Sequence, residues 1–298
     1  MDAEAADAAA SDIAYCACVV YPREKPRCLR RNVDRKGHEM IVDRERAKKA
    51  FADYVRDYNA EDEKVKLKIE HTARVCALCE TIAEESGFGK EELDIAWLAG
   101  LLHDVGRFEQ LRQFGTFNDA QSIDHAEFGA DILFKGGRIR DYAEDASEDT
   151  LLERTVRYHS AYRLPEELSA REARFANLLR DADKIDILKV NIIVPLEEIY
   201  NVTTSELKNC VVSDAVMQGF YEEHAILRSL KRTPVDNVVG HISLVYELVY
   251  PVSYRIVYRQ GFLDKLMGFV SDLPETNAQF AEIRKKMTAY IRKKAGID

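Results

Sequence analysis

The sequence predicts an all-α protein, on three observations. The chain has 298 residues, 46% of them hydrophobic and 32% charged, enough to bury the core of one large domain or of a domain with an extension. It contains only 14 Gly and 7 Pro, and most of the prolines lie outside the apolar periodic stretches, which favours long helices over many short strands. We find no internal repeat and no alternating pattern long enough to build a sheet.

The charge and the hydropathy of the chain limit its partners and its location. The formal net charge of −9 argues against a nucleic-acid groove or an anionic membrane surface, because both partners need a basic footprint. No stretch approaches the roughly 18 consecutive apolar residues of a membrane-spanning helix, and residues 1–12 are acidic where a signal peptide would be basic. We expect a cytoplasmic protein without a membrane partner, and leave open whether it forms an oligomer.

The six cysteines are expected to be reduced, because the chain is long and has no export signal. Cys76 and Cys79 lie three positions apart in a helical pattern and are predicted to be buried core thiols. The alternative of a Cys3His zinc site concerns Cys16, Cys18, Cys28 and His38. Paired C-x2-C knuckles are missing there, which argues against that alternative.

The chain divides into three predicted segments. Residues 1–40 are predicted to be a poorly ordered tail, because an Ala/Asp-rich start is followed by prolines and a basic cluster. Residues 41–200 are predicted to form the helical core. Residues 201–298 are predicted to form a helical extension that packs on this core.

Apolar residues that recur at three and four positions predict the first three helices. The first begins at Asp43 and runs to about residue 58, and the second covers about 61–86, with Gly87 as its stop signal. The third covers about 90–103. It is apolar on several sides, which predicts a central place in the bundle.

Capping residues and prolines mark the later helices. Asp124 and Glu127 predict a box-like cap for a helix that closes at Gly136, and another helix covers about 147–160. Ser169 and Glu172 predict a capping box for a helix that runs to about residue 189. Beyond residue 194, helical stretches are predicted near 204–230, 235–250 and 275–294.

Four histidines and two aspartates fall on consecutive predicted helices, in the order His, His-Asp, His, His, Asp. They are His71, His103, Asp104, His125, His159 and Asp183. Antiparallel helices can bring such side chains to one inward point, which is how metal sites in helical bundles are built. Imidazole nitrogen and carboxylate oxygen suit Fe, Mn, Zn and similar ions. The sequence therefore predicts a metal site.

This ordering resembles the HD superfamily of metal-dependent phosphohydrolases, over roughly residues 45–200. The defining residues would be His71, the doublet His103-Asp104, and Asp183. His125 and His159 are similar to the extra histidines of the two-metal members. The phrase HDVGRFEQ, which begins at His103, resembles a group of uncharacterised bacterial HD-domain proteins. The resemblance implies an HD-domain helical bundle, here with a C-terminal helical extension.

The resemblance also implies two divalent metal ions, with Asp104 as the bridge between them. One ion would be held by His71, His103, Asp104 and Asp183, and the second by Asp104, His125 and His159. Two divalent ions against two carboxylates leave about two positive charges, which favours a phosphate oxyanion and a bridging hydroxide as the nucleophile.

Arg107 and Lys184 are the candidate catalytic residues beside Asp104. Arg107 stands where many two-metal relatives carry Lys, and its guanidinium could clamp a phosphate with two donors. The alternative is an ion pair with Glu109 or another acid. Lys184 follows Asp183 directly and is a second candidate for phosphate binding.

The expected function is hydrolysis of a phosphomonoester or phosphodiester in a small metabolite or nucleotide, an EC 3.1-like activity. The same six-ligand order occurs in di-iron oxygenases similar to myo-inositol oxygenase. Metal identity and redox state separate the two, and the sequence encodes neither. A third alternative is a non-catalytic sensor of a nucleotide or metal.

Overall fold

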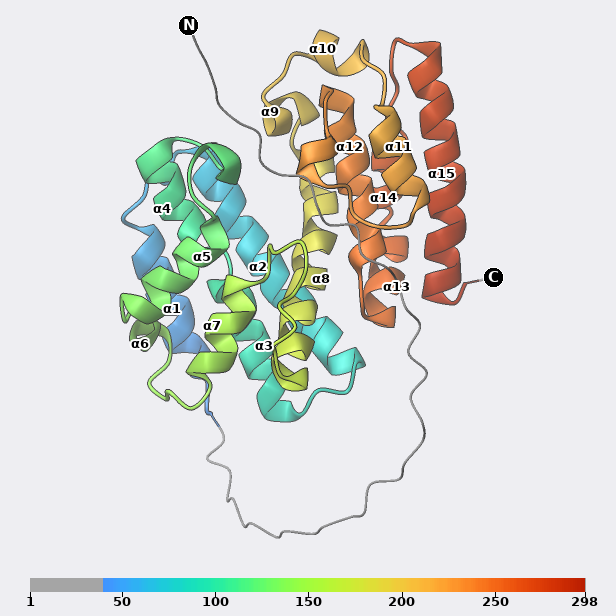
Figure 1. The fold of residues 1–298 in the computed structure, drawn as a ribbon. Helices are drawn as coiled ribbons and strands as arrows, with labels where there is room; N and C mark the ends of the chain where they lie inside the picture. Colours follow the sequence, from blue (N-terminus) through green and yellow to red (C-terminus); the bar gives the residue numbers. More distant parts are fainter. Residues whose placement is uncertain (1–39, 298) are drawn as a thin grey trace, which may run out of the picture. The chain divides into compact units, whose positions relative to one another are not determined.

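Helices make up all of the regular structure in residues 40–297, the part of the chain that the computed structural model describes (Figure 1). No strand occurs in this range, so the predicted all-α fold is confirmed. None of its helices is both long enough and apolar enough to span a bilayer. The predicted tail, apart from Met40, lies outside the described residues, as do the candidate zinc ligands Cys16, Cys18, Cys28 and His38.

The N-terminal part of the bundle contains helices α1 to α8. Their bounds are α1 Arg44–Val55, α2 Glu63–Glu85, α3 Lys90–Leu102, α4 Val105–Phe114, α5 His125–Ala130, α6 Ile139–Tyr142, α7 Asp149–Arg157 and α8 Ala170–Ile193. A π-helical turn, Asp131–Lys135, follows α5 directly. The longest of these helices, α2 and α8, contact each other and α3 (Figure 1).

Side-chain caps explain where several of these helices begin. The Asp43 carboxylate caps α1, and Ser169 with Glu172 forms the predicted capping box of α8. Asp124 caps α5 by accepting hydrogen bonds from the backbone N–H groups of Ala126 and Glu127. The predicted starts of these helices therefore agree with the structure to within one or two residues.

Helix α3 lies in the core, as its sequence predicts. Every residue from Ile95 to Leu102 is buried. It packs so closely on α2 that a Cβ atom on Gly100 would lie 2.9 Å from the Cys76 Cα atom. Cys76 and Cys79 are buried free thiols, so their predicted place in the core is confirmed.

The C-terminal part of the chain adds further helices and contacts α8. They are α9 Leu196–Tyr200, α10 Thr204–Lys208, α11 Asp214–Tyr221, α12 Pro234–Ser243, α13 Pro251–Gln260, α14 Phe262–Met267 and α15 Pro274–Ala295. The carboxylate of Asp181 in α8 accepts hydrogen bonds from the backbone N–H groups of Val249 and Tyr250, directly before α13. This contact and others place the C-terminal helices against the core helix α8.

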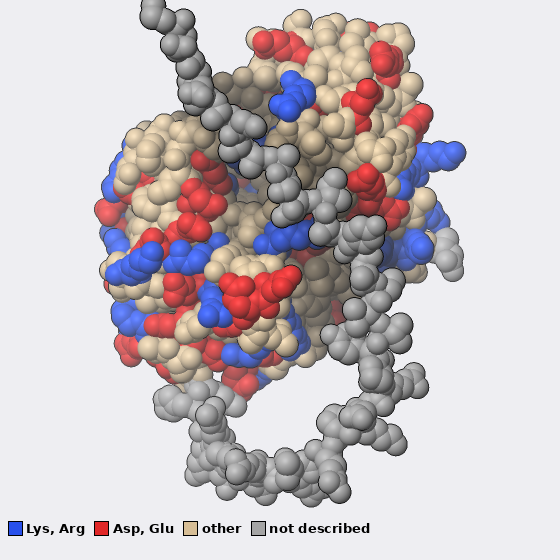
Figure 2. Space-filling model, viewed as in Figure 1, with Lys and Arg blue, Asp and Glu red and all other residues tan. Residues whose placement is uncertain are grey.

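Acidic and basic side chains are mixed over the face of the described residues shown in Figure 2. The basic side chains do not form a continuous track on this face. Such a surface is not suited to following the phosphates of a nucleic-acid strand.

Candidate metal centre

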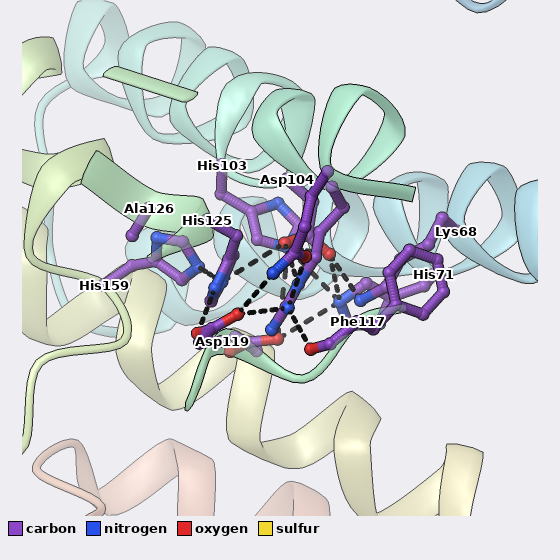
Figure 3. A network of polar contacts seen from close by, with 12 residues as sticks. Lys68, His71, His103, Asp104, Phe117, Asp119, His125, Ala126 and His159 are labelled. Carbon is purple, nitrogen blue, oxygen red and sulfur yellow. Dashed lines mark hydrogen bonds and ion pairs between the residues drawn. The ribbon is translucent and has the colours of Figure 1, made fainter. Parts of the chain in front are cut away.

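The six side chains that the sequence singles out come together inside the bundle. Figure 3 labels all of them except Asp183. His71 comes from α2, His103 and Asp104 from the junction of α3 and α4, His125 from the first turn of α5, His159 from the turn after α7, and Asp183 from α8. The four histidines and Asp104 are at most 4% exposed. The Asp183 side chain is 16% exposed, so it is the most accessible of the six.

Four of the six side chains form a first group. The Nε2 atom of His71 lies 3.2 Å from Nε2 of His103 and 3.1 Å from Oδ1 of Asp183. Oδ2 of Asp104 lies 3.5 Å from His71 Nε2 and 3.4 Å from His103 Nε2. Ligand atoms about 2.1 Å from one ion lie about 3–3.5 Å from each other. The first group therefore has the spacing of a metal-ligand set.

The second group is formed by His125, His159 and the other oxygen of Asp104. The Nε2 atoms of His125 and His159 lie 3.1 Å apart, and His125 Nε2 lies 3.6 Å from Asp104 Oδ1. Two sets of three residues have the geometry of sites that could hold a metal ion: His71, His103 and Asp104, and Asp104, His125 and His159. Asp183 adjoins the first set through His71. Asp104 turns one oxygen toward each group, as a bridging carboxylate would.

The hydrogen bonds of the Nδ1 atoms determine which nitrogen of each histidine faces inward. Nδ1 of His103 lies 2.7 Å from the Gly100 carbonyl oxygen, and Nδ1 of His159 lies 2.7 Å from the Val156 carbonyl oxygen. A carbonyl oxygen can only accept, so each Nδ1 carries a hydrogen, and Nε2 is the nitrogen that is left to bind an ion.

Carboxylates fix the other two histidines in the same way. Nδ1 of His71 donates to Asp186 at 2.7 Å, and Nδ1 of His125 donates to Asp119 at 2.8 Å. The Nε2 lone pairs of His125 and His159, whose pKa values are both lowered, therefore face each other across 3.1 Å, and the Nε2 atoms of His71 and His103 lie 3.2 Å apart. Lone pairs at this distance repel unless a cation lies between them, so the residues present fit a divalent metal ion.

The charges around the two groups also favour a cation. Burial would raise the pKa of Asp104, but the ammonium of Lys68 and the neighbouring imidazoles hold it well below its usual range. Burial and Lys68 oppose a positive charge on His71, but Asp183 and Asp186 outweigh them and raise its pKa. Burial lowers the pKa of His159 to about 3, so this imidazole is neutral. Ionised carboxylates and a neutral imidazole are the states that metal binding needs.

Lys68 is a residue of this centre that the sequence analysis did not identify. Its Nζ atom lies 2.7 Å from Oδ2 of Asp104, and its side chain is 17% exposed. The ammonium also lies 5.5 Å from the ring centre of Phe117 (Figure 3). A signal was present in the sequence, because Lys68 stands three positions before His71 and therefore shares its helix face.

Arg107 lies beside the centre, but part of its guanidinium is already hydrogen-bonded to other protein groups. Its Nη1 atom donates to Asp119 Oδ1 at 2.7 Å and to the Phe117 carbonyl oxygen at 2.6 Å. Its Nε atom is buried without a hydrogen-bond partner among the described residues and lies 3.7 Å from Asp104 Oδ1. Arg107 therefore pairs with an acid, Asp119, while Glu109 pairs with Arg112.

Lys184 has no hydrogen-bond partner for its Nζ atom within residues 40–297. Burial and the nearby charge of Arg180 lower its pKa to about 8. Arg180 itself donates to the carbonyl oxygens of Tyr158 and Ala161, on either side of His159. A phosphate contact by Lys184 remains a prediction, because in the described structure its ammonium makes no hydrogen bond or ion pair with the six-residue centre.

Fold and site together define a helical bundle whose buried histidines and aspartates can hold a divalent metal ion. Residues 69–188 match the family model of the HD domain, and this segment contains all six side chains of the centre. The chain therefore carries an HD domain over these residues. No curated protein and no solved structure matches the chain.

Proposed function

We propose that the protein is a metal-dependent hydrolase that cleaves a phosphoester of a small metabolite or nucleotide at a two-metal centre. The observation that carries this proposal is the place of Asp104, whose two oxygens lie between two groups of inward-facing imidazoles. Fe, Mn and Zn are the ions that suit these ligands. Bound there, two divalent ions would supply Lewis acidity and an activated water.

The protein's own charges favour an anionic substrate. Asp119 is balanced by Arg107, and Asp186 is balanced by Arg74, with which it makes hydrogen bonds of 2.7 and 2.9 Å. Among the described residues, the ligand carboxylates and Asp124, which lies beside Asp119 and His125, then remain to offset the charge of the ions. The loaded centre would be positive, as the binding of a phosphate group requires.

Lys68 and Arg107 are the side chains that we propose to bind the substrate's phosphoryl oxygens. The Lys68 ammonium is held at Asp104 Oδ2, the atom that the first ion would take. Loading of the centre would free this ammonium for an anion at the same place. The Nε atom of Arg107, buried and unpartnered in the described structure, is the nearest further donor.

The experiment that tests the proposal measures metal content and phosphoester hydrolysis on the same preparations. Protein purified without chelators is compared with Asp104→Ala and His125→Ala on p-nitrophenyl phosphate and bis-p-nitrophenyl phosphate. The control is Lys49→Ala, because Lys49 forms an exposed ion pair with Asp53 in α1, a helix that supplies none of the six ligands. We expect two metal ions per chain, with turnover reduced at least about 100-fold in both variants and unchanged in the control.

Four other outcomes would contradict the hydrolase. Turnover that survives Asp104→Ala, or protein without bound metal, would remove its basis. Two iron ions without phosphoesterase activity would favour the oxygenase related to myo-inositol oxygenase. Ligand binding without turnover would favour the sensor.

A further inference from the structure

Asp119 connects the second group of ligands to a set of hydrogen-bond donors behind it. It lies in the 3-10 turn η1, Asp119–Gln121, between α4 and α5. Its Oδ2 atom accepts from Nδ1 of His125 at 2.8 Å. Its Oδ1 atom accepts from Nη1 of Arg107 at 2.7 Å and from Nε2 of Gln110 at 2.9 Å. Oδ2 thus binds the histidine of the second group, whereas Oδ1 binds the donors behind it.

Both groups that face Oδ1 can only donate. A guanidinium has no acceptor atom. The fully buried Gln110 is held in one orientation, because its Nε2 atom lies 2.9 Å from the Ile123 carbonyl oxygen, which can only accept, and its Oε1 atom accepts from Arg107 at 2.9 Å. The donors at Oδ1 therefore cannot be reversed by turning the Gln110 amide.

The tautomer of His125 depends on a side chain, whereas two other histidines of the centre depend on the backbone. Backbone carbonyl oxygens accept from Nδ1 of His103 and of His159. No side-chain substitution can change these two acceptors directly. At His125 the acceptor is Asp119, six positions earlier in the chain.

We infer that Asp119 is a positioning residue that holds His125 as the Nδ1–H tautomer and thereby keeps the Nε2 lone pair available to an ion in the second group. This inference rests on the two-metal centre proposed above. It assigns to the turn between α4 and α5 a specific part in metal binding, although the turn itself supplies none of the six ligands.

An amide at position 119 would reverse the tautomer. Asparagine has the shape of aspartate but only one acceptor oxygen. Arg107 and Gln110 would orient that oxygen toward themselves, which leaves the NH2 group facing Nδ1 of His125. Nδ1 would then have to accept, the hydrogen would move to Nε2, and the lone pair that binds the ion would be lost.

Alanine at the same position has a different effect. It removes the acceptor without introducing a donor, so His125 would populate both tautomers. Asp119→Asn should therefore weaken metal binding more than Asp119→Ala. If Asp119 served only to support the turn, Asp119→Ala would weaken metal binding more than Asp119→Asn, because Asn preserves the shape of the side chain and Ala does not.

Nitrogen-15 NMR of histidine-labelled, metal-free protein reads the tautomer directly, with His125→Gln to assign the signal. We expect the Nδ1–H form in the wild type and the Nε2–H form in Asp119→Asn. Titration with Zn²⁺ should show two sites in the wild type. In Asp119→Asn one site should be unchanged and the other weakened about 10- to 100-fold.

Ser122→Ala is the matched control. Ser122 directly follows the turn that contains Asp119, and its hydroxyl lies 2.8 Å from Gln110 Nε2. The acceptor for Nδ1 of His125 is Asp119, which this substitution leaves in place. The Ser122→Ala variant should keep the wild-type tautomer and both Zn²⁺ affinities. An Nδ1–H signal in Asp119→Asn, or Asp119→Ala weaker in metal binding than Asp119→Asn, would overturn the inference. A wild type that binds fewer than two Zn²⁺ ions would instead contradict the two-metal centre, while the NMR signal would still test the role of Asp119.

Discussion

Each histidine of the centre has one nitrogen bound to the protein and the other turned toward the ligand groups. The acceptors are two backbone carbonyl oxygens and the carboxylates of Asp119 and Asp186. The rings are thus oriented before any ion binds, which lowers the entropic cost of assembling the site. Lys68 adds a positive charge at the carboxylate that faces both groups.

Substitution of Lys68 should separate substrate binding from metal binding. Lys68→Ala removes an ammonium that competes with the first ion for Asp104 Oδ2, so metal content should be retained. Loss of a charged contact to the phosphoryl group should reduce kcat/KM about 10- to 100-fold. Parallel metal analysis and steady-state kinetics test this, with Lys66→Ala as the control, because Lys66 forms an exposed ion pair with Glu63. A loss of metal comparable to that of Asp104→Ala would show that Lys68 has a structural role instead.

The sequence order was sufficient to predict which six side chains meet, because they lie on, or at the ends of, successive helices of the bundle. It was not sufficient to predict Asp186 as a partner of His71, since the two residues are 115 positions apart. Nor did it predict Asp119, an acid in a polar loop that resembles many solvated acids. Such contacts depend on the packing of helices, which a residue pattern does not specify.

At the scale of the elements, two glycines let α4 and α5 approach each other closely. A Cβ atom on Gly106 would lie 2.6 Å from the backbone nitrogen of Gly129, and one on Gly129 would lie 2.9 Å from that of Gly106. Backbone atoms cannot move aside as a side-chain end can. This crossing determines how far His125, at the start of α5, lies from Asp104, at the start of α4.

Gly106→Ala should therefore affect both stability and the second ligand group. We expect the free energy of unfolding to fall by about 3 kcal/mol, because the added methyl group must separate two backbones. Urea unfolding and Zn²⁺ titration measure the two effects. Gly219→Ala in α11 is the control: its Cβ atom would meet mainly the mobile end of Ile226, at 3.0 Å, so we expect a change within about 1 kcal/mol. Wild-type stability in Gly106→Ala would contradict the close crossing.

Helices α4 and α13 show where element prediction from the sequence failed. Helix α4 begins at Val105, two residues after the end of α3 at Leu102, without a Gly or Pro between them, and therefore gave no separate start signal. The sequence pattern predicts a helical stretch near 235–250 and none over 251–260, whereas Pro251 occupies the first turn of α13, where its missing N–H group costs nothing. The predicted stretch 204–230 contains α10, α11 and a 3-10 turn, because local caps divide it.

At the scale of the whole described chain, α8 connects the centre to the C-terminal helices. Asn191 near its end, Tyr200 and His241 form a polar network: Tyr200 donates to Asn191 Oδ1 at 2.8 Å, and His241 Nδ1 lies 2.7 Å from the same oxygen. We keep the domain boundary near residue 200 as a proposal. The network shows that α8, α9 and α12 make direct contact across that position.

This network makes a prediction about pH. Burial, with a contribution from Lys231, lowers the pKa of His241 to about 3, whereas the unfolded value is about 6.5. Below pH 6.5 the unfolded chain therefore binds a proton that the folded chain does not, and stability falls as the pH falls from about 6.5 toward 3. His241→Gln should lose about 1–2 kcal/mol less free energy of unfolding than the wild type between pH 7 and pH 5.

Urea unfolding at both pH values tests this prediction. His224→Gln serves as the comparison, because Ala225 and Glu222 raise the pKa of His224. Without His224, the free energy of unfolding that is lost between pH 7 and pH 5 should equal the wild-type loss or be slightly larger. An identical pH dependence in the wild type and His241→Gln would show that His241 titrates normally in the folded protein.

The distribution of the six ligands over five segments of the bundle has a consequence for how the protein opens. Fraying of α2, α5 or the turn after α7 would each withdraw a ligand, so each opening would forfeit part of the same binding free energy. Local fluctuations that are independent in an ordinary bundle would thereby become one cooperative event. With ions bound, the HD domain would resist proteases and hydrogen exchange as a single unit, because every local opening would cost binding free energy at the same centre.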